Sequence, residues 1–216
     1  EWPELPELRS LHVTINGLRS LAWIRTPQLD LLHLAGTDLE DLSGVGHAAS
    51  LDLAFQGGRR KGPPMRSLRG LEGNDRIREI DVRGLKIDLS ELATLPALQA
   101  IEASDGDNLR ALRGARSVRW LKVTGYASGV PVASWADAGV PPPQCSLDFL
   151  DGWTSLTWLV LTDSGVMTGL DTLSALPELD KIHLRGSATK RNQWPDALQE
   201  KLDFVSGYHT YRKPSS

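Results

Sequence analysis

A short hydrophobic motif recurs along most of the chain: an aliphatic residue, two other residues, a second aliphatic residue, one further residue and a third aliphatic residue. Its clear copies are Leu8-Leu11-Val13, Leu29-Leu32-Leu34, Ile77-Ile80-Val82, Val118-Leu121-Val123, Leu156-Leu159-Leu161 and Leu179-Ile182-Leu184, and its weaker copies are Ala48-Leu51-Leu53 and Leu98-Ile101-Ala103. The last two apolar positions of each copy are two residues apart, which is the period of a strand with one buried face. The motif predicts eight short strands whose buried residues include Leu11, Leu32, Leu51, Ile80, Ile101, Leu121, Leu159 and Ile182.

A second motif, three apolar residues at intervals of three, lies between the strand motifs. Its copies are Leu18-Leu21-Ile24, Leu39-Leu42-Val45, Met65-Leu68-Leu71, Leu89-Leu92-Leu95, Leu109-Leu112-Ala115, Leu147-Leu150-Trp153 and Leu170-Leu173-Leu176. Positions three apart share one face of a 3₁₀ helix, so these triplets predict short 3₁₀ or single-turn segments. Five of the seven triplets end three residues before the next strand motif, so the two motifs form one repeating unit.

The combined unit resembles a leucine-rich repeat of the short type, about 22 residues long, which is found in bacterial internalin-like proteins. Residues 27–47 and 154–184 are the closest copies, and the resemblance extends from residue 5 to about residue 187. It implies an α/β solenoid: a leucine-rich repeat horseshoe with a parallel concave β-sheet of about eight strands and short 3₁₀ or irregular convex segments.

The chain departs from this family at the ninth repeat position, where the family usually has an asparagine that bonds neighbouring backbones. The residues found there are Asn16, Thr37, Gln56, Leu85, Gly106, Tyr126, Ser164 and Ser187. Only one of them is an asparagine, so we expect an incomplete side-chain ladder and a locally irregular solenoid.

Two insertions interrupt the repeats, at residues 54–64 and 126–146, and both leave the solenoid from the same edge. One-sided insertions in repeat arrays often flank the binding face. The Arg59-Arg60-Lys61 run in the first insertion is interpreted as a solvated loop rather than a contact for an acidic partner. Trp135 in the second insertion has two interpretations: it packs back onto the solenoid, or it stands exposed as a binding anchor.

The ends of the chain predict the domain organisation. Trp2 and Leu5 have the spacing of the second and third members of a triplet, so residues 1–187 read as a solenoid that starts in mid-repeat, as if cut from a larger protein. We expect both residues to pack on the convex side. Residues 188–216 read as a C-terminal capping helix, from about Asn192 to Leu202 with Pro195 in its first turn, followed by a tail.

Composition narrows the classes of partner and compartment. The 24 basic and 27 acidic side chains give a net charge of −3, without the basic excess typical of nucleic-acid-binding domains. No apolar run approaches the length of a membrane span, so neither a membrane nor a nucleic acid is expected as a partner. Cys145 is the only cysteine, which excludes an intrachain disulfide and favours a cytoplasmic location.

No catalytic motif of a protease, hydrolase, nucleotide-binding or dinucleotide-binding protein is present. Cys145 is interpreted as inert, because a cysteine nucleophile needs a basic partner that nothing in the sequence indicates. His12 and His33 could bind a metal together with Asp52, but a flat sheet provides no enclosing second shell. We therefore expect no enzyme activity, no metal and no cofactor.

The strand register predicts which side chains line the concave face, because side chains alternate along a strand. The middle row reads His12, His33, Asp52, Asp81, Glu102, Lys122, Val160 and His183, and the row on one side of it contains Glu79, Trp120, Trp158 and Lys181. The candidate partner-binding residues are Trp120, Trp158, Val160, Asp81, Glu102, Glu79, Asp52, Lys122 and Trp135. They combine an exposed tryptophan pair with an acidic stripe (Glu79, Asp52, Asp81 and Glu102). The alternative is that the 126–146 insertion folds over Trp120 and Trp158 and forms a satellite core.

These features predict a non-catalytic module that recognises a partner protein on its concave face and the flanking insertions. The mid-repeat start and the capped end resemble the C-terminal sensor region of a bacterial NLR-like (NACHT-type STAND ATPase) antiphage defence protein. That resemblance implies a foreign protein as the ligand, or the N-terminal part of the same polypeptide as the partner. The alternative is a stand-alone inhibitor, an immunity protein whose acidic face neutralises a basic toxin.

Overall fold

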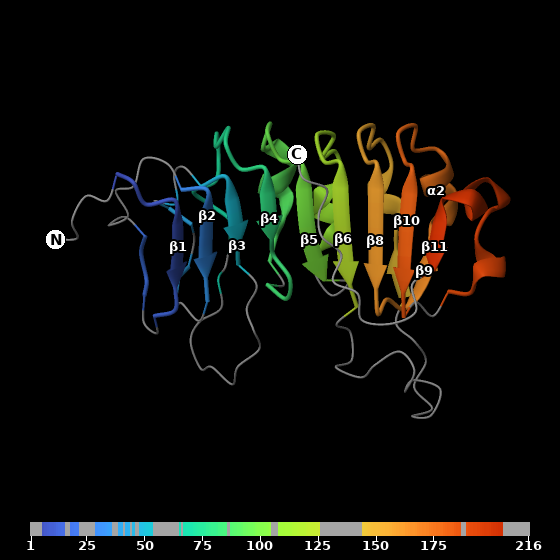
Figure 1. The fold of residues 1–216 in the computed structure, drawn as a ribbon, viewed down its shortest axis with the longest axis horizontal. Helices are drawn as coiled ribbons and strands as arrows, with labels where there is room; N and C mark the ends of the chain where they lie inside the picture. Colours follow the sequence, from blue (N-terminus) through green and yellow to red (C-terminus); the bar gives the residue numbers. More distant parts are fainter. Residues whose placement is uncertain are drawn as a thin grey trace, which may run out of the picture.

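A computed structural model of the chain describes residues 6–15, 18–21, 29–35, 39–40, 42–43, 45, 48–53, 65, 67–85, 87–104, 108–125, 144–186 and 189–204. One long sheet runs through the described residues, with its strands in sequence order and every neighbouring pair parallel (Figure 1). Its strands are β1 (Ser10–Val13), β2 (Leu31–Leu34), β3 (Ser50–Asp52), β4 (Glu79–Asp81), β5 (Ala100–Ser104), β6 (Trp120–Thr124), β8 (Trp158–Thr162), β10 (Lys181–Arg185) and β11 (Leu202–Phe204). The predicted parallel solenoid is confirmed, with one strand beyond the eight expected.

The convex segments follow from the spacing of the apolar triplets. They include the 3₁₀ helices η1 (Ser90–Thr94), η2 (Leu109–Leu112) and η4 (Asp148–Leu150) and the α-helix α2 (Leu170–Ser174). The carbonyl oxygen of one triplet member accepts a hydrogen bond from the amide of the next: Leu92 N to Leu89 O is 3.0 Å, and Leu150 N to Leu147 O is 3.0 Å. The interval of three is therefore the interval of the 3₁₀ hydrogen bond.

A continuous core lies between the sheet and the convex segments. Seven of the eight strand residues predicted to be buried are at most 2% exposed. Leu11 is the exception and is only half-buried. It lies in β1, the end strand of the sheet, whose side chains pack against a described neighbour on one side alone. The position of a repeat in the stack thus limits the burial that its motif can achieve.

The C-terminal segment differs from the predicted capping helix. It forms two 3₁₀ helices, η5 (Arg191–Gln193) and η6 (Asp196–Lys201), and then the ninth strand, β11. Proline disfavours helical geometry at the residue before it, and Trp194 is accordingly extended with ψ 141°. Pro195 therefore separates two short turns instead of starting one helix. Residues 205–216, the predicted tail, lie outside the described part of the chain.

The structure also differs from the predictions in the second insertion and at the ninth repeat position. The last residues of the insertion form β7 (Gln144–Ser146), which pairs in parallel with β9 (Val166–Thr168) in a separate two-stranded sheet. At the ninth repeat position, Leu85 is buried and apolar, and the buried Ser164 hydroxyl has no hydrogen-bond partner among the described residues. The other residues listed for that position lie outside the described residues, as do Trp2, Leu5, residues 54–64 and residues 126–143. Among the described residues, no helix is long and apolar enough to cross a membrane.

Candidate functional site: the concave face

The concave middle row has the register that the sequence predicts. His12 pairs with His33, His33 with Asp52, and so on through Asp81, Glu102, Lys122, Val160 and His183. The row continues to Asp203 on β11, which the sequence analysis did not place there. Because neighbouring strands lie about 4.8 Å apart, each member of the row can contact the next.

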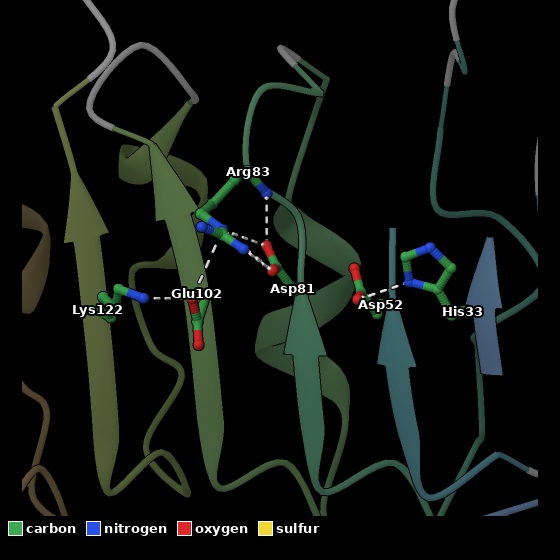
Figure 2. Close-up of polar contacts among 6 residues, drawn as sticks. All are labelled: His33, Asp52, Asp81, Arg83, Glu102 and Lys122. Atoms are coloured by element: carbon green, nitrogen blue, oxygen red, sulfur yellow. Dashed lines mark hydrogen bonds and ion pairs between the residues drawn. The ribbon is translucent and has the colours of Figure 1, made fainter. Parts of the chain in front are cut away.

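Charged side chains on and just after β4 and on β5 and β6 pair with one another (Figure 2). The guanidinium of Arg83 donates to both carboxylate oxygens of Asp81, with Nε–Oδ1 and Nε–Oδ2 distances of 2.9 Å and 3.0 Å. Lys122 Nζ donates to Glu102 Oε2 at 2.8 Å, and Arg83 Nε lies 3.5 Å from the same oxygen. These groups form one internally neutralised network in place of an open acidic stripe.

The histidines at the amino-terminal end extend this pairing. His33 Nδ1 lies 2.7 Å from Asp52 Oδ2, and the His12 and His33 rings are 5.2 Å apart at their centroids (Figure 2 shows the His33–Asp52 contact). Within the described residues, no three histidine, cysteine or acidic side chains are placed to hold a metal ion. Glu79, the remaining member of the predicted stripe, is half-buried and has a contact of its own. Every acid of the stripe therefore has a partner.

The tryptophan pair differs from the expectation of two exposed anchors. Trp120 is only 7% exposed and Val160 only 1%, and with Ala100 they form a small buried cluster separate from the main core. Trp120 lies directly between Ala100 and Trp158 in the strand register, so its large ring packs over a small neighbour on one side and against an indole on the other. The prediction that Trp120 and Val160 are exposed is wrong. The alternative, in which the 126–146 insertion covers the pair as a satellite core, depends on residues up to position 143 that lie outside the described part, so it stays a prediction.

Trp158 packs against this cluster and is only half-buried. The His183 ring lies 4.8 Å from its ring at 37°, and Lys181 Nζ lies 5.9 Å from its ring centroid. Its indole Nε1 is buried and has no hydrogen-bond partner among the described residues. Trp158 is thus held in one orientation by its neighbours on β10 and still presents part of its ring.

His183 is the titratable group whose pKa the site perturbs most clearly. Burial lowers the pKa of His183 below its ordinary value; nearby Asp203 acts to raise it and Lys181 to lower it further. Its Nδ1 lies 3.0 Å from Asp203 Oδ2. The buried imidazole is therefore stabilised in its neutral form, which suits packing against an indole ring.

Asp203 could not be placed from the strand motif, because β11 lacks the full motif. Leu202 and Phe204 repeat the spacing of Ile182 and Leu184 after 20 residues, within the range of the other repeats, but Gln199 stands where an aliphatic anchor is expected. The repeat interval alone could have found the strand.

The remaining candidates do not join this surface. Trp135 lies outside the described residues, so its two interpretations stay predictions. Cys145 is buried in β7 at 4% exposure. β7 belongs to the two-stranded sheet and not to the long concave sheet. Residues of β7, among them Ser146, also line an open cleft of about 530 Å³ together with Asn108, Arg110 and Asp148.

Comparison with family models and with curated proteins finds no match. Among solved structures, the crystal structure of an internalin C2 from Listeria monocytogenes strain 4b F2365 aligns with a TM-score of 0.55 and 18% sequence identity. The alignment covers 91% of this chain and 80% of the internalin. At that identity the likeness concerns the fold alone. Together with the nine-stranded parallel sheet and the hydrogen-bonded convex triplets, it shows that this chain has the leucine-rich repeat solenoid fold of the internalin type.

Proposed function

We propose that this chain is a non-catalytic protein-recognition module whose concave face binds a partner protein around Trp158. The observation that carries the proposal is the state of Trp158 itself. It is half-buried, packs against the Trp120–Val160 cluster and the His183 ring, and keeps part of its ring at the surface. Tryptophan is enriched among binding hot spots because it presents a large, rigid contact area.

The rigidity of the surroundings also supports binding. Trp158 lies in the interior of a continuous nine-stranded sheet, between β6 and β10, and not on a loop. A side chain that is already held in its bound orientation loses little conformational entropy when a partner covers it. The charged groups of the middle row are engaged with each other, as in the Arg83–Asp81 and Lys122–Glu102 pairs, which favours a recognition surface over a reaction centre.

The finer form of the proposal is a cytoplasmic, ligand-sensing C-terminal region of a bacterial NLR-like antiphage defence ATPase. Its basis is the sequence resemblance, and its partner is a foreign protein or the ATPase portion of the same polypeptide. The rival, an immunity protein for a basic toxin, needs an acidic face that is open to the toxin. Arg83, Lys122 and His33 engage three acids of that face, which favours the sensor. An ATPase module encoded upstream in the same reading frame supports the sensor; a toxin gene next to the coding sequence supports the rival.

The test of protein recognition is to map a binder. Fragments of phage and bacterial proteins are displayed and selected on the full chain, and hydrogen–deuterium exchange of the complex is followed by mass spectrometry. We expect protection in β6, β8 and β10, where Trp158 and its neighbours lie. Protection confined to the convex triplets, or no binder from either source, contradicts the proposal.

A further inference from the structure

We infer that the partner segment that docks against Trp158 is acidic, with a carboxylate next to a large apolar side chain. The inference rests on the proposed function and specifies the chemistry of its ligand. It reverses the sign of charge that the predicted acidic stripe suggested for the partner. Two sets of observations carry it: the engagement of the acids at one end of the concave face, and the cations around Trp158 at the other.

The acids of the stripe have little attraction left for a basic partner. The Arg83 guanidinium donates to both carboxylate oxygens of Asp81, and only 14% of the Asp81 side chain is exposed. Glu102 binds Lys122 and also lies near Arg83. A partner lysine or arginine would have to displace a cation that is already held by geometry, so its net gain in free energy would be small.

The cations lie at the other end, close to Trp158. Lys181 is exposed, pairs in register with Trp158 and extends over its ring. Lys201, the last residue of η6, immediately precedes Leu202, and Leu202 pairs with Ile182, so Lys201 corresponds in register to Lys181. Arg185 is on the same face of β10, two positions beyond His183, and has a contact of its own. Asp203, the acid on this part of the row, lies beside His183 with 59% of its side chain exposed, and the two lysines outnumber it. An anionic side chain fits beside Lys181 for these reasons.

The apolar part of the ligand follows from Trp158. Its exposed ring surface borders the buried Trp120–Val160 cluster, so an aliphatic or aromatic side chain placed there extends an existing apolar surface. The expected segment thus places Asp or Glu within one or two residues of Leu, Phe or Trp.

The experiment selects a random 12-residue peptide library on the full chain and measures binding of the enriched peptides by fluorescence anisotropy. Four variants are compared: Lys181→Glu, Lys181→Arg, Trp158→Ala and, as a matched charge reversal away from the concave row, Arg116→Glu, which is exposed in the turn before β6. We expect acidic–apolar peptides whose affinity falls roughly tenfold in Lys181→Glu and Trp158→Ala and less than about twofold in Lys181→Arg and Arg116→Glu. Raised salt should weaken the wild-type complex.

The outcomes separate the inference from the proposed function. Two outcomes overturn the inference and leave the proposed function standing. In one, the enriched peptides are basic; in the other, they need Trp158 but bind the Lys181→Glu variant with the same affinity as the wild type. Peptides that bind without regard to Trp158 overturn both. A Trp158-dependent dimer in sedimentation, with no peptide enriched, shows a second copy of the chain as the occupant and also overturns the inference.

Discussion

The two halves of the concave face share one backbone register but use it differently. In β1 to β5 the row is built of histidines and acids, and a lysine from β6 completes the pairing with Glu102. In β6 to β11 the same rows carry Trp120, Trp158 and His183, which pack as rings. Strand pairing is equally regular in both halves. The difference shows that the solenoid fixes where side chains point. The chemistry of those side chains decides whether the polar groups of a stretch pair with one another or whether the stretch remains available to a partner.

The largest effect is expected at a close backbone contact of the C-terminal half. A Cβ on Gly125, which follows β6, would overlap the carbonyl oxygen of Asp163 after β8, whereas Gly84 after β4 has open space around it and φ 78°. We expect Gly125→Ala to lower the free energy of unfolding by about 3 kcal/mol or more, because backbone must move. Gly84→Ala should cost about 1 kcal/mol, the price of a left-handed residue. Urea denaturation of both variants measures the difference, and equal losses contradict the close contact.

The next effect separates the two tryptophans. Trp120 is 7% exposed, so Trp120→Ala removes a buried side chain and should destabilise the chain by about 3 kcal/mol. Trp158→Ala removes a ring that is only half-buried and should cost about 1 kcal/mol, with a much smaller change in melting temperature. Differential scanning calorimetry gives both values. A larger loss in Trp158→Ala than in Trp120→Ala would mean that the two rings have been assigned the wrong roles.

The charge network of the amino-terminal half should have a smaller effect. Asp81→Asn breaks a pair whose side chains are 14% and 31% exposed, and after allowance for solvent screening we expect a loss of about 1 kcal/mol of unfolding free energy. Glu102→Gln should lose less, since its side chain is 25% exposed and its partner Lys122 can be solvated. If the stripe bound a basic partner, both changes would slow association. We expect association with an acidic peptide to be unchanged or faster, measured by stopped flow at two salt concentrations.

The smallest effect is a pH dependence of the C-terminal half. Burial lowers the pKa of His183 in the folded state below the value of about 6.5 for an unfolded chain. The unfolded chain therefore binds more protons just below pH 6.5, and stability should fall as the pH drops through that range. His183→Gln removes this contribution. Urea midpoints at pH 7.5 and 5.5 should differ more in the wild type than in His183→Gln; an equal or larger difference in the variant speaks against a depressed pKa.

Much of the fold could be predicted from the sequence because its two periods have direct physical meaning. The alternation in Leu32 and Leu34 reports a half-buried strand, and the interval of three in Leu89-Leu92-Leu95 reports a 3₁₀ hydrogen bond. β11 escaped prediction because Gln199 replaces the aliphatic anchor. The two turns before it were read as one helix, although Pro195 disfavours helical geometry at Trp194.

The site was predicted less completely, because register places side chains but does not determine their contacts. The sequence placed Asp81, Glu102 and Lys122 correctly along one row. It could not reveal that Arg83, two residues after Asp81, would fold back over the strand and engage it. Nor could it reveal that Trp120 and Val160 would be buried on a sheet face that alternation alone marks as exposed.

The measurement that tests the central claim most directly compares Trp158 with its counterpart in the other half. Leu31 lies in the same row on β2 and is also half-buried, so Leu31→Ala is the matched control for Trp158→Ala. Isothermal titration calorimetry with a ligand selected on the wild-type chain should show at least about tenfold weaker binding in Trp158→Ala and less than about twofold in Leu31→Ala. Equal losses in the two variants, or unchanged binding in both, would contradict recognition centred on the C-terminal half of the concave face.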